Sequence, residues 1–216
     1  MIYKIAPVED VYLENIYRES LNDLNAFYGI DWKHHLPKII IIDDRKIINL
    51  LKGEETESWI IGWSEGRTIY VLNKDNFGKE SDHKYNPFEY SAFITHELSH
   101  SFYNILSDGP RKPIWLNEGM AIHTSGQNKF KKQPVEFKKF LEFYDHGGKE
   151  IYNEAGFAIE LLIKKSGKEK LLTFIKNLKN YSSKDLFEQA FEREYGFFPN
   201  YKEFNRLISH SSIERQ

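Results

Sequence analysis

The stretch that most constrains this chain is His-Glu-Leu-Ser-His at residues 96–100. An α-helix turns by about 100° per residue, so His96 and His100 lie one turn apart on the same face. Two imidazoles in that relation can bind one zinc ion, and Glu97 beside them can polarise a water molecule on the metal. Apolar residues surround the pentad and predict a helix that is largely buried, in which these polar side chains need a partner. The sequence therefore predicts a metal site.

Composition narrows the chemistry of that site. The chain has 216 residues, 40% of them hydrophobic and 15% aromatic, which suffices for one domain or two closely packed lobes. A net charge of −2 gives no indication of a nucleic-acid or membrane-surface partner. There is no cysteine, so zinc must be held by histidine and carboxylate. The basic run at 129–132 is interpreted as a solvated surface segment.

Hydrophobic periodicity and the positions of Gly and Pro predict an α+β fold. Helices are predicted over residues 7–28, 45–52, 87–108, 113–122, 134–144, 152–166, 168–178, 184–195 and 201–208. A buried strand is predicted at 38–42, a hairpin from 58–63 and 67–72, and a loop at 73–86. The polar connector at 127–133 separates a mixed N-terminal lobe, 1–126, from an all-helical C-terminal lobe, 127–216. We expect the two lobes to form one compact catalytic unit.

No segment has the apolar length of a signal peptide or of a membrane span. We therefore expect a cytoplasmic protein without a membrane partner. The sequence carries no signal for an oligomeric state.

A catalytic zinc needs three protein ligands and one open position. The metzincin pattern requires Gly three residues and His six residues after the second histidine, where this chain has Tyr103 and Leu106. The remaining common solution is a glutamate on the next helix. Glu118 follows His100 by eighteen residues, after a turn that can fold its helix back against the first.

The pentad, followed by Trp-Leu-Asn-Glu-Gly-Met-Ala at 115–121, resembles the gluzincin metallopeptidases, the clan of thermolysin and the zinc aminopeptidases. The second segment is especially similar to the aminopeptidase-like branch, in which the glutamate completes the zinc site. The likeness spans roughly 38–208, is strong at 95–121 and is loose elsewhere. It implies a zincin-like N-terminal lobe in which the hairpin at 58–72 lies along the bound substrate.

The resemblance implies a zinc metallopeptidase that acts on a peptide or protein. One Zn²⁺ per chain would be held by His96, His100 and Glu118, and Glu97 would be the general base for the water that attacks the peptide carbonyl. The clan also supplies an oxyanion donor from the helical lobe, and Tyr152, at a helix start, is the favoured candidate. The rival donors are His146, Tyr144 and Tyr103.

The chain also departs from the pattern of the clan. Thermolysin-like members carry an aspartate four residues after the third ligand, where this chain has Ile122, so Asn117 or His123 is the candidate partner of a ligating histidine. The Gly-x-Met-Glu-Asn signature of the large aminopeptidases is absent. Glu65 is a candidate for binding a substrate amine, although a solvated turn carboxylate is the favoured interpretation.

Two alternatives stay open at this stage. A zinc-binding regulatory or interaction domain would keep the metal without peptidase turnover. The same apparatus could also hydrolyse a bond other than a peptide bond. Endopeptidase and aminopeptidase action are not distinguished by the residues.

Overall fold

The computed structural model describes residues 6–109 and 112–213, with side chains described as far as residue 209. It confirms the α+β fold class, a small sheet combined with many helices. The α-helices are α1 Val11–Tyr28, α2 Arg45–Lys52, α3 Phe77–Glu80, α4 Pro87–Ser107, α5 Ile114–Thr124, α6 Ile151–Ser166, α7 Lys168–Lys176, α8 Lys184–Tyr195 and α9 Tyr201–Ile213. The strands are β1 Lys38–Ile42, β2 Gly62–Glu65 and β3 Thr68–Leu72.

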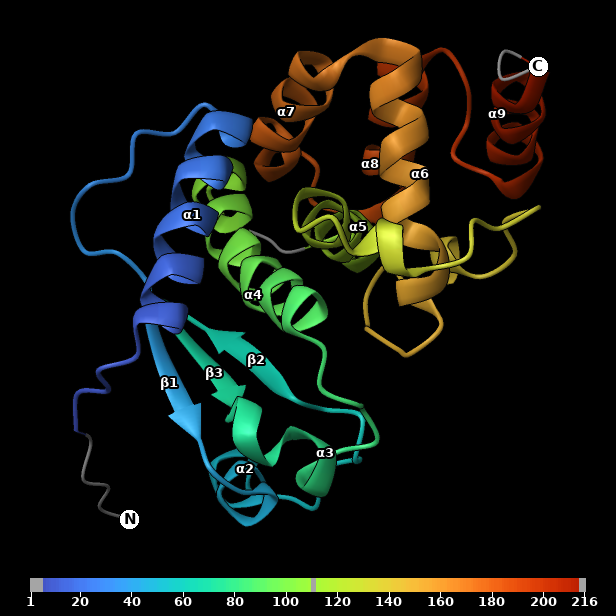
Figure 1. Ribbon diagram of the computed structural model, residues 1–216. Coiled ribbons are helices and arrows are strands. Elements are labelled where there is room, and N and C mark those ends of the chain that lie inside the picture. Colours follow the sequence, from blue (N-terminus) through green and yellow to red (C-terminus); the bar gives the residue numbers. More distant parts are fainter. Residues whose placement is uncertain (1–5, 110–111, 214–216) are drawn as a thin grey trace.

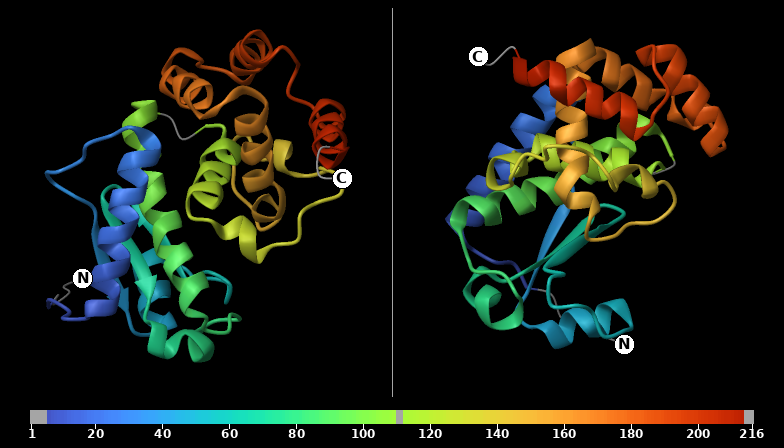
Figure 2. Two further views of the ribbon diagram at one scale, coloured as in Figure 1. Left: turned by 45° about the horizontal axis from the view of Figure 1, so that its top comes forward. Right: turned by 90° about the vertical axis from the view of Figure 1, so that its right-hand side faces the viewer.

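The sheet has the order β1-β3-β2, with β1 parallel and β2 antiparallel to the central strand β3. Helices α1 and α4 lie side by side over one face of the sheet (Figure 1). Helices α5 to α9 lie beyond α4, and α5 and α6 run close together in both further views (Figure 2). Helix α4 therefore lies between the sheet part and the helical part of the molecule.

Helix α4 begins and ends where its sequence predicts. The Asn86 side chain accepts hydrogen bonds from the backbone N–H groups of Phe88 and Glu89, Pro87 occupies the first turn, and Asp108 ends the helix in the left-handed conformation. Two hydroxyl pairs join α4 to α1: Ser20 to Thr95 at 2.7 Å and Tyr28 to Ser99 at 2.8 Å. These contacts fix the rotation of α4, and so the direction in which its histidines point.

The prediction of a helix at 134–144 is wrong. This segment is irregular apart from a 3₁₀ turn at Phe140–Glu142. The buried carboxylate of Glu154 accepts hydrogen bonds from the backbone N–H groups of Lys138, Lys139 and Phe140 at 2.9–3.1 Å. Because a side chain from α6 satisfies these groups, the segment does not need an intrahelical ladder to bury Phe137 and Phe140.

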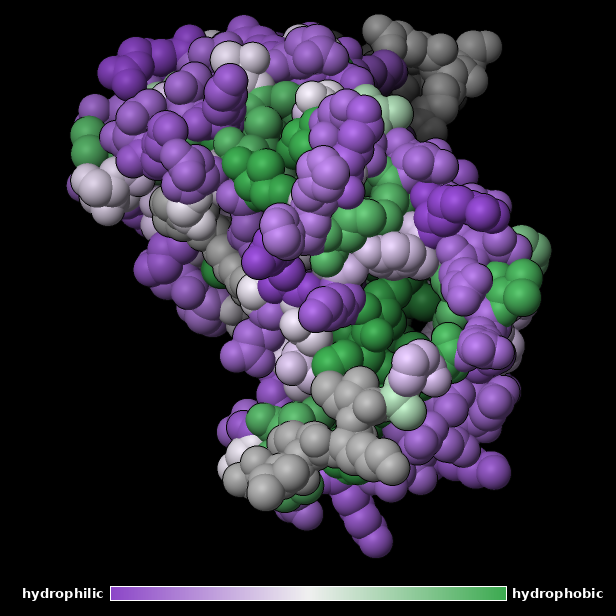
Figure 3. Space-filling view, turned by 90° about the vertical axis from the view of Figure 1, so that its left-hand side faces the viewer, coloured by the Kyte–Doolittle hydropathy of each residue, from purple (hydrophilic) through white to green (hydrophobic). Residues whose placement is uncertain are grey.

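The prediction for β1 was only partly right. The strand forms, but of its residues only Ile42 is fully buried, because the strand lies at the edge of the sheet instead of inside it. Figure 3, which views the molecule from this side, shows hydrophobic residues reaching the surface between hydrophilic ones. The predicted hairpin forms, but its first strand covers 62–65 instead of 58–63, and its second covers 68–72 instead of 67–72. The predicted loop at 73–86 contains a 3₁₀ turn, Lys74–Asn76, and the one-turn helix α3.

Arg45 holds the segment that leads into β2. Its guanidinium donates hydrogen bonds to the carbonyl oxygens of Glu57, Ser58, Ile60 and Glu80 and to the Thr56 hydroxyl. A guanidinium offers five donors in a rigid plane and suits this role. The chain at 56–60 is thereby fixed without belonging to a strand.

Helices α5 and α6 approach so closely that two glycines are required. A Cβ on Gly119 would lie 2.7 Å from the Ala155 carbonyl oxygen, and one on Gly156 would lie 2.3 Å from a methyl carbon of Ile122. The predicted boundary at 126/127 separates these two helices in sequence, and the division into lobes stays a prediction.

Within residues 6–109 and 112–213, no helix combines the length and apolar character needed to cross a lipid bilayer.

We expect Glu154→Gln to destabilise the fold, because three backbone N–H groups lose an anionic acceptor. The free energy of unfolding should fall by about 2–3 kcal/mol and Tm by about 5–10 °C. Glu150→Gln, an exposed position at the start of the same helix, is the control and should leave Tm unchanged. Equal Tm values for the two variants in a thermal melt would contradict the role given to Glu154.

Candidate metal centre and active site

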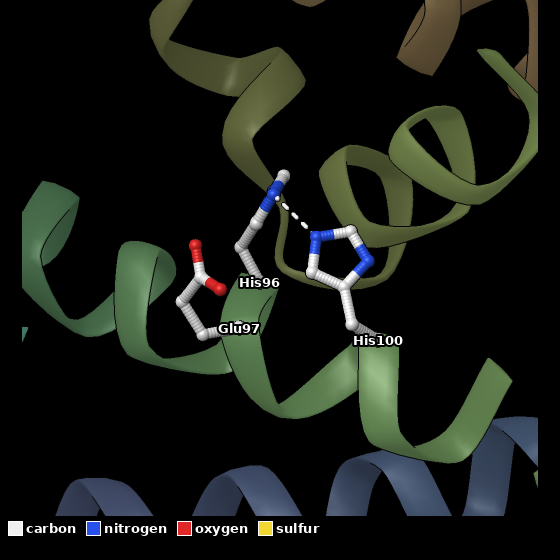
Figure 4. Close-up of side chains that lie close together, drawn as sticks. All are labelled: His96, Glu97 and His100. Carbon is white, nitrogen blue, oxygen red and sulfur yellow. Dashed lines mark hydrogen bonds between the residues drawn. The ribbon is translucent and has the colours of Figure 1, made fainter. Parts of the chain in front are cut away.

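The structure brings together the three side chains predicted to bind zinc. The Nε2 atoms of His96 and His100 are 3.2 Å apart, and Figure 4 shows both side chains on one side of α4 with these nitrogens pointing toward each other. Glu118 comes from α5, with Oε2 3.3 Å from His96 Nε2 and Oε1 3.7 Å from His100 Nε2. Both imidazoles are buried, with 3% and 7% of their surface exposed.

Hydrogen bonds on the far side of each ring favour one tautomer of the neutral imidazoles. His100 Nδ1 lies 2.8 Å from Asn117 Oδ1, and His96 Nδ1 lies 3.1 Å from Gln127 Oε1. An amide oxygen only accepts, so each Nδ1 carries a proton and donates it. In a neutral imidazole the Nε2 atom then presents a lone pair. Two lone pairs and a carboxylate therefore face one another in a buried space.

Such a centre of acceptors favours positive charge, either a proton on an imidazole or a metal ion. Among the described atoms, Glu118 Oε2 is buried and has no hydrogen-bond donor. Ligand atoms about 2.0–2.1 Å from a tetrahedral zinc ion lie about 3.3 Å from one another, close to the 3.2, 3.3 and 3.7 Å separations found here. The residues therefore fit a His₂Glu zinc site, with amide oxygens orienting both imidazoles.

A second carboxylate, that of Glu97, lies beside the same histidines. One ligand atom from each of His96, Glu97 and His100 falls within 4.8 Å of the others. The contacts of Glu118 with the two imidazoles are shorter, so Glu118 is the better third ligand. Glu97 is 6% exposed and also lines a cavity beside the metal centre, so it is near both the histidines and the space open to a bound molecule.

The charge state of Glu118 follows from its neighbours. Burial acts to raise the pKa of its carboxyl group. When His100 and His96 are protonated, their positive charges and the Tyr152 hydroxyl outweigh burial and lower this pKa to about 2. Glu118 is therefore a carboxylate whenever positive charge is present at the imidazoles.

Tyr152, in the first turn of α6, lies next to this cluster. Its hydroxyl interacts with the Glu118 carboxylate, and its ring centre is 6.1 Å from that of His96. Burial, and then the negative charges of Glu118 and Glu97, raise the pKa of the Tyr152 hydroxyl well above its usual value. The hydroxyl thus stays protonated and can donate a hydrogen bond.

The rival oxyanion donors lie elsewhere. His146 is exposed and contacts the ring of Phe143. Tyr144 packs against Phe187, and Tyr103 is buried in the core. None of these three rivals lines the cavity at the metal centre.

A cavity of about 510 Å³ opens beside the metal centre. Its walls come from the segment at 59–63, from the first half of α4, from residues 127–131 and from the start of α6. His96, Glu97 and Tyr152 all reach it, and aromatic side chains supply much of the remainder: Trp59, Trp63, Tyr90, Phe93 and Phe130. The part of the hairpin expected to lie along a substrate, 59–63, is therefore next to the predicted chemistry.

Two contributors were missed by sequence reasoning. Gln127 was assigned to a polar connector, and Lys131 to a solvated basic run. Gln127 instead contacts His96, and Lys131 is half-buried and lines the cavity. Single polar residues in a segment without periodicity give no signal of such contacts.

The remaining candidates are resolved by their surroundings. Asn117, one of two proposed partners of a ligating histidine, contacts His100. His123, the other, packs against Phe27, and burial lowers its pKa. Ile122, at the place of the clan's aspartate, is fully buried against Gly156. Glu65 is exposed at the end of β2 and does not line the cavity.

No protein family, curated protein or solved structure matches this chain. The resemblance to gluzincins stays a prediction carried by the residues quoted for it.

We expect the metal-free protein to bind one zinc ion per chain, with Tm rising on addition of zinc. Glu118→Ala should lower zinc affinity by more than about 100-fold, and Asn117→Ala, which frees the far side of His100, by about 10–100-fold. Affinities can be measured by competition with a chelator. Glu65→Ala, at an exposed carboxylate, serves as the control. Unchanged affinity in Glu118→Ala would remove Glu118 from the ligand set.

Proposed function

We propose that this protein is a zinc-dependent metallopeptidase that hydrolyses peptide bonds. The observation that carries the proposal is the acceptor-only centre of His96, His100 and Glu118, placed beside a cavity that Glu97 and Tyr152 also reach. Three ligands without a thiolate leave an open position, as catalytic zinc sites do, whereas structural sites are closed. The resemblance to gluzincins, which does not depend on these distances, implies the same three zinc ligands.

Zinc bound by these residues supplies Lewis acidity, which polarises a carbonyl oxygen and makes water a nucleophile near neutral pH. Asn117 and Gln127 keep both imidazoles in the tautomer that can ligate. Glu118 contributes a negative charge to the centre, consistent with its low pKa.

Glu97 moves the proton. Its carboxylate takes a proton from the attacking water as the water oxygen bonds to the carbonyl carbon. It then gives the proton to the leaving amine as the carbon–nitrogen bond breaks, which returns the carboxylate to its starting state. Its place in the cavity wall beside His96 suits both transfers.

Tyr152 stabilises the negative charge that develops on the carbonyl oxygen. Its hydroxyl keeps its proton at neutral pH because burial and two carboxylates raise its pKa. In the free protein the hydroxyl interacts with Glu118, so its hydrogen bond is redirected to the oxyanion when substrate is present.

The alternative is a zinc-binding regulatory or interaction domain without turnover. This alternative requires the same zinc ligands, but in it neither Glu97 nor Tyr152 takes part in a reaction. The two variants that follow therefore separate the alternatives.

Glu97→Gln should retain zinc and Tm but lose peptidase activity by at least about 10²–10⁴-fold, since the carboxylate is used as base and then as acid. Activity is measured as cleavage of a mixed peptide library followed by mass spectrometry. Glu89→Gln removes an exposed carboxylate from the same cavity wall and is the matched control. Wild-type rates in Glu97→Gln would exclude this mechanism, and no cleavage by the zinc-loaded parent would favour the alternative.

Tyr152→Phe removes a single oxygen atom, so zinc content and Tm should stay the same while kcat falls about 10²-fold. His146→Ala, at the exposed rival position, should leave kcat unchanged. The measurement is kcat on the best peptide found in the library. If Tyr152→Phe keeps its kcat and His146→Ala loses it, the donor is His146.

A further inference from the structure

The wall of the cavity carries more positive than negative charge away from the metal centre. Lys52, Lys131 and Lys149 line it, whereas Glu89 is the one lining carboxylate besides Glu97 among the described residues. Lys52 and Lys149 are exposed at the rim, and Lys52 lies over the Trp63 ring at 4.6 Å. Lys131 differs from both because its side chain is half-buried beside the proposed oxyanion donor.

Lys131 has an incomplete set of partners. Its Nζ donates to the backbone carbonyl oxygen of Tyr152 at 2.7 Å and lies 5.7 Å from the centre of the Tyr152 ring. An ammonium offers three donors, and no carboxylate in the described part of the chain forms an ion pair with this one. Burial lowers the pKa of Lys131 to about 8, against the opposing effect of Glu118. At neutral pH Lys131 is thus positively charged without an anion in direct contact.

A desolvated ammonium is costly unless a negative partner reaches it. The one hydrogen-bond acceptor found for this ammonium among the described residues is a neutral carbonyl oxygen, and Glu118 acts on it without forming an ion pair. The cavity lies beside the remaining donors. Neighbouring Lys132 has the same charge but is exposed and does not line the cavity. The position of Lys131 therefore points to an anionic group on the bound molecule, close to the group that contacts the reacting carbonyl.

We propose that the site selects peptides with a carboxylate near the scissile bond and that Lys131 binds this carboxylate. This inference rests on the proposed peptidase function. The carboxylate can be the side chain of an acidic residue or the free carboxyl terminus of the peptide. Both present the same two oxygens to an ammonium and form a charge-assisted hydrogen bond. Lys131 is thus a specificity-determining residue.

The test uses the full chain loaded with zinc and acetylated, amidated octapeptides of Ala and Leu. Glu replaces each position in turn, a Gln series provides the neutral counterpart, and the parent peptide is also made as a free acid. We expect one position of Glu, or the free acid, to exceed its neutral counterpart in kcat/KM by about tenfold or more. In Lys131→Met this ratio should fall to about one, because the acidic peptide loses more rate than its neutral counterpart. Lys132→Met should keep the parent ratio.

The pattern of ratios identifies the source of the carboxylate and decides the role of Lys131. A preference within the Glu series alone indicates an acidic side chain, and a preference for the free acid alone indicates the carboxyl terminus. A merely structural Lys131, holding Tyr152 through its carbonyl oxygen, would lower the rate on acidic and neutral peptides alike. Ratios near one in the parent protein, or an undiminished ratio in Lys131→Met, would overturn the proposal.

Binding gives a readout that does not need turnover. Zinc-loaded Glu97→Gln, with and without Lys131→Met, is titrated calorimetrically with the Glu and Gln peptides. About tenfold tighter binding of one Glu peptide, abolished by Lys131→Met, supports the proposal even if no peptide is cleaved. Failure of cleavage with this preference present contradicts the peptidase proposal alone, whereas cleavage without any preference contradicts the role of Lys131 alone.

Discussion

Three acceptor atoms meet where α4 packs against α5, and they repel one another unless a cation lies between them. Helices α4 and α5 hold His96, His100 and Glu118 in this arrangement. Because these helices are largely buried, the side chains cannot rotate into solvent. Asn117 and Gln127 hold the neutral imidazoles in the tautomer whose Nε2 is an acceptor. If the proposed zinc ion binds here, its binding free energy adds directly to the stability of the contact between the sheet part and the helical part of the molecule.

Much of this arrangement could be predicted from the sequence where the pattern is periodic. The pentad in α4 and the glutamate in α5 follow from helical spacing and resemblance, and the α+β class follows from alternating apolar runs. The segment at 134–144 could not be predicted, because Phe137 and Phe140 show helical spacing while Glu154, distant in sequence, satisfies their backbone. Gln127 and Lys131 lie in a polar stretch whose conformation depends on tertiary contacts alone.

The cavity is built from parts with different degrees of order. On one side, α4 and α6 present His96, Glu97 and Tyr152 from regular helices. On the other, the segment at 59–61 belongs to no strand and is held by the guanidinium of Arg45 through neighbouring carbonyl oxygens. The helical side that carries the reacting groups therefore faces a segment of irregular backbone. Arg45, the backbone hydrogen bond from Leu72 to Ile61 and the contact of His83 with the Trp59 carbonyl oxygen hold that segment in place.

The close approach of α5 and α6 determines which parts of the chain are free to diverge. Gly119 adjoins Glu118, and Gly156 lies one turn beyond Tyr152 on α6. Because a Cβ at either glycine would collide with the other helix, backbone contact sets the spacing between the acidic ligand and the tyrosine. The aromatic core around Trp115, Phe191 and Phe204 is formed by side-chain contacts, so we expect exchanges between large side chains there to alter this spacing less. Over evolutionary time we expect these two glycines to persist while the surrounding core drifts.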